Sequence, residues 1–178
     1  NFPAAMIARK AGPALAAGCT MVVKPASQTP LTALALGELA LRAGVPAGVF
    51  NVVTGADTRA IGGVLTSHPL VRKITFTGST EVGRVLLQQS ASTIKKCSME
   101  LGGNAPCIVF DDADLDLAVE GILVAKFRNT GQSCIAANRV LVQDGIHDAL
   151  ARRLAERVAG LKVGNGLDDG VQIGPMID

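Results

Sequence analysis

The chain has 178 residues, of which 48% are hydrophobic and 18% charged, and its formal net charge is +2. This length and composition predict a globular chain with one domain or parts of two, and so small a charge gives no support for nucleic acid or an anionic membrane surface as a partner. There is no Trp or Tyr and there are only five Phe, so side chains that stack on bases are scarce. No apolar run approaches the roughly 18 residues of a membrane span.

Strands and helices are predicted to alternate through the first hundred residues. The predicted strands cover residues 20–25, 49–55, 73–78 and 95–101. The predicted helices cover residues 4–17 (kinked or restarted near Pro13), 31–43 (closed by Gly44), 58–67 and 79–90 (capped by Ser79 or Thr80). Because parallel neighbouring strands need crossover connections, this alternation predicts a parallel, doubly wound α/β sheet.

The pattern changes around residues 101–104, where we place a domain boundary. The stretch NAPCIVFDDADLDLAVEGILVAKFRN predicts a strand, an acidic turn and a helix with Asp114 and Asp116 near its start. NRVLVQ predicts another strand, and residues 146–159 another helix. The first residue is Asn and the chain ends in a loop-like stretch, so we expect an excerpt of a longer protein.

Four cysteines are spread along the chain: Cys19, Cys97, Cys107 and Cys134. None forms a CxxC pair, so no zinc site is expected, and buried, reduced thiols are predicted for the first three. Cys134 differs because Gly, Gln and Ser precede it, and the IAAN that follows is predicted to begin a helix, whose partial positive charge would favour a thiolate. Its local sequence leaves a nucleophile and a buried structural cysteine equally open.

Polar groups also follow three predicted strands. Glu100 ends one strand in MELGGN, Ser79 follows another in FTGST, and Lys24 follows a third in VVKPAS. Ligands of open α/β sheets bind at the carboxyl ends of the strands, and a helix start can hold a phosphate. Taken singly, each also fits a solvated strand end or an ordinary turn.

Five motifs occur together in this chain: NFP at the start, KPASQTP, FTGST, MELGGN and GQSC. In this order and spacing they resemble the aldehyde dehydrogenase superfamily, whose active-site signatures are MELGG and FxNxGQxC. The likeness covers all 178 residues and is strongest to bacterial succinate-semialdehyde dehydrogenases, in stretches such as LRAGVPAGVFNVVTG and IVFDDADLDLAVEG.

The resemblance implies a catalytic role for three residues. Cys134 is the implied nucleophile, and the Asn1 amide and the Cys134 N–H are the implied donors to the oxyanion. Glu100 is the implied general base for the hydrolytic water. The fold implied is a cofactor-binding part, residues 1–101, followed by the first part of a catalytic domain, residues 102–178, with the site in the cleft between them.

The cofactor implied is NADP in preference to NAD. The implied contacts are Lys24, Pro25, Ala26 and Ser27, then Gly78 and Ser79 for the pyrophosphate, and Leu101 near the nicotinamide. Family members that prefer NAD often carry Glu at the position of Ser27, where a carboxylate would repel a 2′-phosphate.

The substrate implied is succinate semialdehyde, with Arg9 and Arg128 holding its distal carboxylate. Glutarate semialdehyde stays open, because one methylene changes binding by only about 1–3 kcal/mol. An inactive nucleotide-binding fragment also stays open, whereas neither His68 nor His147 lies in a context that supports a cysteine protease. The resemblance further implies a cytoplasmic homotetramer that acts in GABA degradation. Ala136 stands where some relatives have a second, redox-active cysteine.

Overall fold

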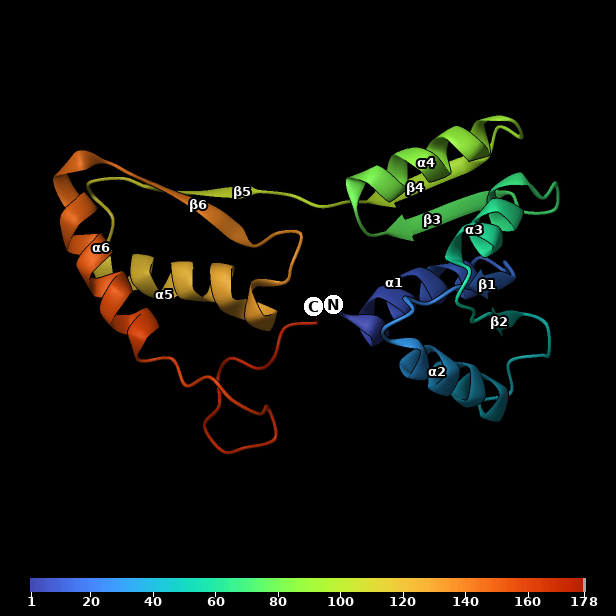
Figure 1. The fold of residues 1–178 in the computed structure, drawn as a ribbon, viewed down its shortest axis with the longest axis horizontal. Coiled ribbons are helices and arrows are strands. Elements are labelled where there is room, and N and C mark those ends of the chain that lie inside the picture. The colour runs from blue at the N-terminus through green and yellow to red at the C-terminus, as the bar shows by residue number, and fades with distance from the viewer. Residues whose placement is uncertain (178) are drawn as a thin grey trace. The chain divides into compact units, whose positions relative to one another are not determined.

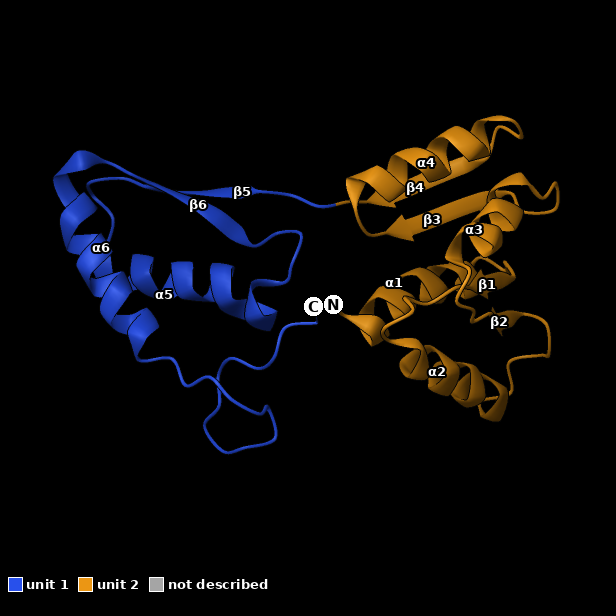
Figure 2. Cartoon of the chain, viewed as in Figure 1, with its two compact units in different colours: residues 1, 102–178 blue, residues 2–101 orange. Residues whose placement is uncertain are grey.

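The structure is a computed structural model that describes residues 1–177. The chain divides into two compact units, one formed by residues 2–101 and the other by residue 1 with residues 102–178 (Figure 2). We call them the first unit (2–101) and the second unit (1, 102–178). Among residues 1–177, no helix is long and apolar enough to cross a membrane.

The first unit alternates helices and strands, as Figure 1 shows. Its helices are α1 (Pro3–Ala16), α2 (Pro30–Arg42), α3 (Thr58–Ser67) and α4 (Thr80–Ala91). Its strands are β1 (Met21–Val23), β2 (Phe50–Val52), β3 (Lys73–Thr77) and β4 (Lys96–Glu100). Every predicted element is present, and each is shifted or shortened by at most a few residues.

The second unit begins with a βαβ crossover. Strand β5 (Ala105–Val109) is followed by α5 (Leu115–Phe127), a short 3₁₀ turn η1 (Arg128–Gly131), β6 (Ala137–Val142) and α6 (Asp144–Ala159). The predicted acidic start of α5 is confirmed, because Asp114 is its N-cap and accepts hydrogen bonds from the Asp116 and Leu117 N–H groups, both at 3.0 Å.

All strand pairs are parallel, which confirms the predicted α/β class. They do not join into one sheet among residues 1–177: β1 pairs with β2, β3 with β4 and β5 with β6, as three separate ladders. The reason is that a strand–helix–strand pattern requires a parallel crossover but does not fix which strands become neighbours. The continuous sheet that we predicted is therefore a set of parallel pairs here.

Helix α1 does not restart at Pro13, which was one of the two predicted alternatives. It runs without a break through Pro13, although proline removes one backbone donor. Helix α2 ends as expected: Gly44 has φ 86°, and the Val45 N–H donates to the Ala40 carbonyl at 3.0 Å, which is a typical left-handed C-terminal turn.

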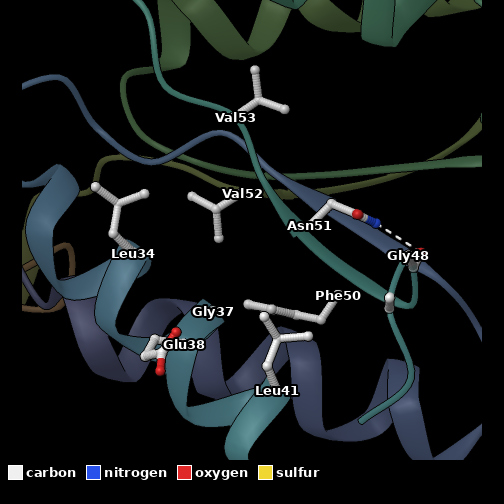
Figure 3. Close-up of a pocket in the computed structure, with 10 residues that line it drawn as sticks. Leu34, Gly37, Glu38, Leu41, Gly48, Phe50, Asn51, Val52 and Val53 are labelled. Carbon is white, nitrogen blue, oxygen red and sulfur yellow. Dashed lines mark hydrogen bonds between the residues drawn. The ribbon is translucent and has the colours of Figure 1, made fainter.

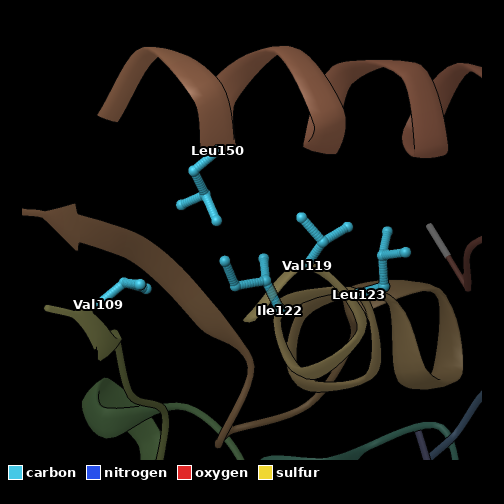
Figure 4. Packing of buried hydrophobic residues seen from close by; sticks show 5 residues of the cluster. All are labelled: Val109, Val119, Ile122, Leu123 and Leu150. Atoms are coloured by element: carbon cyan, nitrogen blue, oxygen red, sulfur yellow. The ribbon is translucent and has the colours of Figure 1, made fainter. Parts of the chain in front are cut away.

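The second unit has a distinct apolar core between β5, α5 and α6 (Figure 4). Its buried members are Val109, Val119, Ile122, Leu123 and Leu150. On α5 the members recur at spacings of three and four residues, which is the period that places side chains on one face of a helix. This core packs α5 against β5 and α6, and the chain then passes from α5 through η1 into the turn around Cys134.

Candidate active site

Cys134 lies in an exposed turn between η1 and β6. No helix begins after it, because Ala137 and Asn138 already belong to β6. The expected help from a helix start is therefore wrong for this thiol. Two features remain: the side chain is accessible, and the Cys134 N–H has no acceptor among residues 1–177. A backbone donor beside an accessible thiol is the arrangement that an oxyanion requires.

Asn1 lies with Cys134 in the second unit. Its side-chain amide donates to the Gln132 carbonyl at 2.8 Å, two residues before the cysteine. An asparagine amide has two N–H donors, so one remains after this bond. The structure thus brings together two of the three predicted catalytic residues, Asn1 and Cys134.

The backbone after MEL touches the same turn. A Cβ atom at Gly103 would lie 2.6 Å from the Cys134 carbonyl oxygen, closer than real Cβ contacts, whereas a Cβ at Gly102 would meet nothing within 4 Å. Arg139, on β6, donates to the Asn104 carbonyl at 3.0 Å and so joins this segment to the strand after Cys134. No role for Arg139 was expected from the sequence.

Glu100 is described with the first unit. It ends β4 directly beside the end of β3, in register with Thr77, and its carbonyl accepts a hydrogen bond from the Gly78 N–H at 3.0 Å. Its side chain is exposed. The predicted position at the carboxyl end of a parallel strand is confirmed, and that is where an α/β sheet carries its reactive groups.

Lys10 is a neighbour of Glu100 that the sequence analysis missed. It extends from α1 and donates from Nζ to the Thr77 Oγ1 atom at 2.6 Å. Partial burial lowers the pKa of Lys10 below its ordinary value; the Glu100 carboxylate opposes this shift and Arg9 adds to it. A lysine with a lowered pKa beside a carboxylate is typical of a functional site. Lys10 lies on α1, far along the chain from Thr77 and Glu100, so no local pattern in the sequence marks this group.

The FTGS segment has the predicted strand–turn–helix form. Ser79 caps α4, and its Oγ accepts from the Val82 N–H at 3.3 Å. A Cβ at Gly78 would lie 2.4 Å from the Phe76 ring, so a side chain there would require the ring to move. The first turn already carries the carboxyl group of Glu81. The Glu81 backbone N–H and the Ser79 hydroxyl donate hydrogen bonds to this carboxyl group and lower its pKa. A phosphate at this helix start would take the place of that carboxylate.

A small cavity of about 280 Å³ lies beside the KPAS segment. It is lined by Pro25, Ala26, Ser27, Pro30, Thr54, Gly55 and Ala56. No carboxylate lines it, and Lys24 stands next to it with its Nζ on the Pro25 carbonyl at 3.0 Å. A place for Thr54, Gly55 and Ala56 in this wall was not expected from the sequence. A polar serine, a nearby cation and the lack of an acidic side chain fit a phosphorylated nucleotide such as NADP.

The larger hollow of the first unit, about 520 Å³, lies between α2 and the segment that leads into β2 (Figure 3). Leu34, Leu41, Phe50 and Val52 give it apolar walls, and Glu38 is its one charged residue. None of the predicted site residues lines it. It therefore has no part in the chemistry considered below.

The two predicted substrate arginines are both exposed. Arg9 lies on α1 in the first unit, and Arg128 lies at the C-terminal end of α5 in the second. Neither forms an ion pair with another side chain among residues 1–177. Both guanidinium groups are thus available to an anionic ligand, and their shared role stays a prediction.

Three of the four thiols, those of Cys19, Cys97 and Cys107, differ from their predicted burial. All are free, but Cys19 is exposed because it follows Gly18 in the turn between α1 and β1, and Cys97 and Cys107 are only half-buried on their strands. No group of three or more His, Cys, Asp or Glu side chains within residues 1–177 is arranged to hold a metal ion.

The described chain thus consists of a parallel α/β unit with a glutamate at a strand end, followed by a unit with an exposed cysteine whose turn accepts a hydrogen bond from an amide. The chain matches the aldehyde dehydrogenase family over residues 1–178 and belongs to that family.

Its relatives include the NADP-dependent succinate-semialdehyde dehydrogenase GabD of Escherichia coli strain K12, 70% identical over the whole of this chain. The glutarate-semialdehyde dehydrogenase of Pseudomonas putida strain KT2440 is 67% identical over the same 178 residues. In both cases this chain spans 37% of the relative's length.

A crystal structure described as an E. coli NADP-dependent enzyme superimposes with a TM-score of 0.97 at 69% identity, over 99% of this chain and 37% of that one. The predicted family and α/β fold are confirmed.

Proposed function

We propose that the protein to which this chain belongs oxidises succinate semialdehyde to succinate with NADP. The observation that carries the proposal is an exposed cysteine whose turn is bonded to Asn1, in a chain of the aldehyde dehydrogenase family. Two relatives of nearly equal identity act, by their names, on succinate and glutarate semialdehyde. The class of substrate, a short aldehyde with a distal carboxylate, is therefore better supported than its exact length.

In the proposed reaction the Cys134 thiolate attacks the aldehyde carbon and forms a thiohemiacetal. The free N–H of Cys134 and the second amide N–H of Asn1 stabilise the resulting oxyanion. The nicotinamide of the bound cofactor supplies the hydride acceptor. When the hydride leaves the carbon, the oxyanion collapses to a thioester on Cys134. Glu100 then takes a proton from water, the water oxygen adds to the thioester carbon, and the thiolate leaves as the acid is released.

The cofactor residues are proposed within the first unit. Ser27 and Lys24, beside the cavity, would bind the 2′-phosphate of the adenosine ribose, with Pro25 and Ala26 as part of its wall. Gly78 and Ser79 would face the pyrophosphate, and Leu101 the nicotinamide end. Replacing Ser27 with Glu puts a carboxylate against the phosphate, so we expect NADP use to fall and NAD use to be retained.

The test is the initial rate of reduced-cofactor formation by the full-length protein with succinate semialdehyde, at low NADP and at low NAD. Faster turnover with NADP, reversed in Ser27→Glu, is the expected result. Faster turnover of the unaltered protein at low NAD would refute the NADP preference and leave the aldehyde chemistry standing.

The acidic end of the substrate is assigned to Arg9 and Arg128. Arg128→Ala should raise KM for succinate semialdehyde by about tenfold and leave KM for a neutral aldehyde of similar length unchanged, because a guanidinium–carboxylate pair contributes about 1.5–3 kcal/mol. Arg59→Ala, an exposed arginine on α3, is the matched control. An equal rise for both aldehydes would remove Arg128 from the substrate site.

The rates of reduced-cofactor formation with succinate and with glutarate semialdehyde, at equal concentrations, decide the chain length of the substrate.

We further propose, from family resemblance, that the protein is a cytoplasmic homotetramer that acts in GABA degradation. Its partner is a small-molecule substrate, without nucleic acid or membrane partners.

A further inference from the structure

The turn that leads to Cys134 has an uncommon backbone. Asn129, Thr130 and Gly131 follow one another with φ values of 54°, 59° and 74°, all in the left-handed region. A helix usually ends with one such residue, and it is usually glycine. Two consecutive residues with side chains in this region are strained, and threonine is among the least suited to it. Such strain persists only where the surrounding structure enforces it.

The enforcing contacts converge on Gln132. Its carbonyl accepts from the Asn1 amide at 2.8 Å and from the Asn129 amide at 3.3 Å, and its N–H donates to the Asn129 carbonyl at 3.1 Å. Its side-chain Oε1 accepts from the Ile177 N–H at 2.9 Å. Gln132 is thus held on its N–H, its carbonyl and its side chain, two residues before the cysteine.

Asn129 also reaches Asn1 directly. Its amide Nδ2 donates to the Asn1 backbone carbonyl at 3.2 Å as well as to Gln132. One side-chain amide therefore connects Asn1 with the turn that carries Cys134. Asparagine suits this place for two reasons: it tolerates the left-handed conformation better than other residues with side chains, and its amide has two donors.

We propose that Asn129 is a positioning residue for the reaction, which fixes Asn1 and the Cys134 turn in one arrangement. It acts through Gln132 and Asn1 and touches no reacting atom. With the two segments joined, the Asn1 amide and the Cys134 N–H keep fixed directions before any aldehyde arrives, and donors fixed in advance are those that stabilise developing charge most. The inference rests on the proposed function of Cys134 and Asn1.

The test uses the full-length protein and three variants. Asn129→Asp is nearly isosteric and tolerates the left-handed conformation but lacks the donors. Asn129→Gly relieves the backbone strain and also lacks the donors. Asn51→Asp is the matched control, because the Asn51 amide also donates to two carbonyls, Met21 at 3.2 Å and Gly48 at 2.8 Å, in the first unit (Figure 3).

The first measurement is the rate of iodoacetamide alkylation at Cys134 at one fixed pH, followed by mass spectrometry of its peptide. Both Asn129 variants should alkylate at a rate that differs from that of the unaltered protein, because a loosened turn no longer holds the exposed thiol in one arrangement. Asn51→Asp should match the unaltered protein. Alkylation needs neither aldehyde nor cofactor. The alkylation result therefore tests the role of Asn129 even if succinate semialdehyde is not a substrate.

The second measurement separates kcat from binding. Both Asn129 variants should lose about tenfold to a hundredfold in kcat, as misplacement of reacting groups by about 1 Å does, with unchanged affinity for NADP. Recovery of the normal alkylation rate and kcat in Asn129→Gly would show that only the backbone conformation matters and would overturn the role of the amide. Alkylation rates and kcat values of both variants equal to those of Asn51→Asp would overturn the proposal altogether.

Discussion

At the scale of single residues, the reactive groups depend on backbone details around them. The Cys134 turn contacts Gly103 so closely that a side chain there has no room. Likewise, Lys10 reaches Thr77 beside the strand end that carries Glu100. Each contact joins residues far apart in the chain. Each gives a prediction that a substitution can test.

Gly103→Ala should displace the Cys134 carbonyl, because the new Cβ would lie 2.6 Å from that oxygen. We expect kcat of the full-length protein to fall by about tenfold to a hundredfold through misplacement of the nucleophile. Gly102→Ala is the control, since a Cβ there meets nothing within 4 Å. Equal losses in the two variants would mean that the contact with Cys134 does not matter.

Lys10 should make stability depend on pH in the alkaline range. Its pKa is lowered from 10.5 in the folded chain, chiefly by burial, so the unfolded chain binds this proton more readily. Stability therefore rises with pH between the folded pKa and 10.5, and below that window Lys10 carries the full cost of its buried charge. Urea midpoints between pH 8 and 11 should rise more steeply for the unaltered protein than for Lys10→Met. Parallel curves would contradict the shift.

At the scale of elements, α5 and α6 are joined both by the apolar core and by exposed ion pairs. Leu150 on α6 is 2% exposed and packs in the cluster with Val119 and Ile122. On the outer side, Arg153 pairs with Asp116 and Arg157 with Glu120. Buried apolar contacts normally outweigh exposed ion pairs, which contribute about 0–1 kcal/mol each.

Leu150→Ala should therefore lower the free energy of unfolding by about 2–5 kcal/mol, because it leaves a cavity in the core. Arg153→Ala should change it by less than about 1 kcal/mol. Urea unfolding of both variants, followed by circular dichroism, makes the comparison. A larger loss for Arg153→Ala would show that the ion pairs hold the two helices together.

At the scale of the whole molecule, the described chain exposes much apolar surface. Leu31, Leu70 and Leu167 are 76%, 78% and 93% exposed, and α5 leaves Leu117 and Val124 uncovered. Exposed apolar surface of this extent marks a face that other parts of a protein, or a partner, normally cover. The chain spans 37% of the length of its curated relatives, which agrees with that view.

The segment 1–178, expressed alone, should form no reduced cofactor and should bind a hydrophobic dye strongly. Its thiols should react with a labelling reagent at several positions, whereas the full-length protein should show one fast cysteine that aldehyde or NADP slows. Turnover by the segment, or one fast thiol protected by NADP, would contradict this expectation.

The sequence by itself determined the order of helices and strands, the parallel α/β class and the family. These follow from local signals: the period of apolar residues, the caps Ser79 and Asp114, the glycine that ends α2, and motifs of adjacent residues. It also placed Glu100 at a strand end, because a strand's end is a local property.

Only the tertiary structure decided the contacts between distant residues. Lys10 with Thr77, Gly103 with Cys134, and Asn129 with Asn1 are 67, 31 and 128 positions apart, and no local pattern marks them. The helix expected after Cys134 and the burial of Cys19 were wrong for the same reason. Local propensity is weak in short loops. The backbone after Cys134 is set by the pairing of β6 with the distant strand β5.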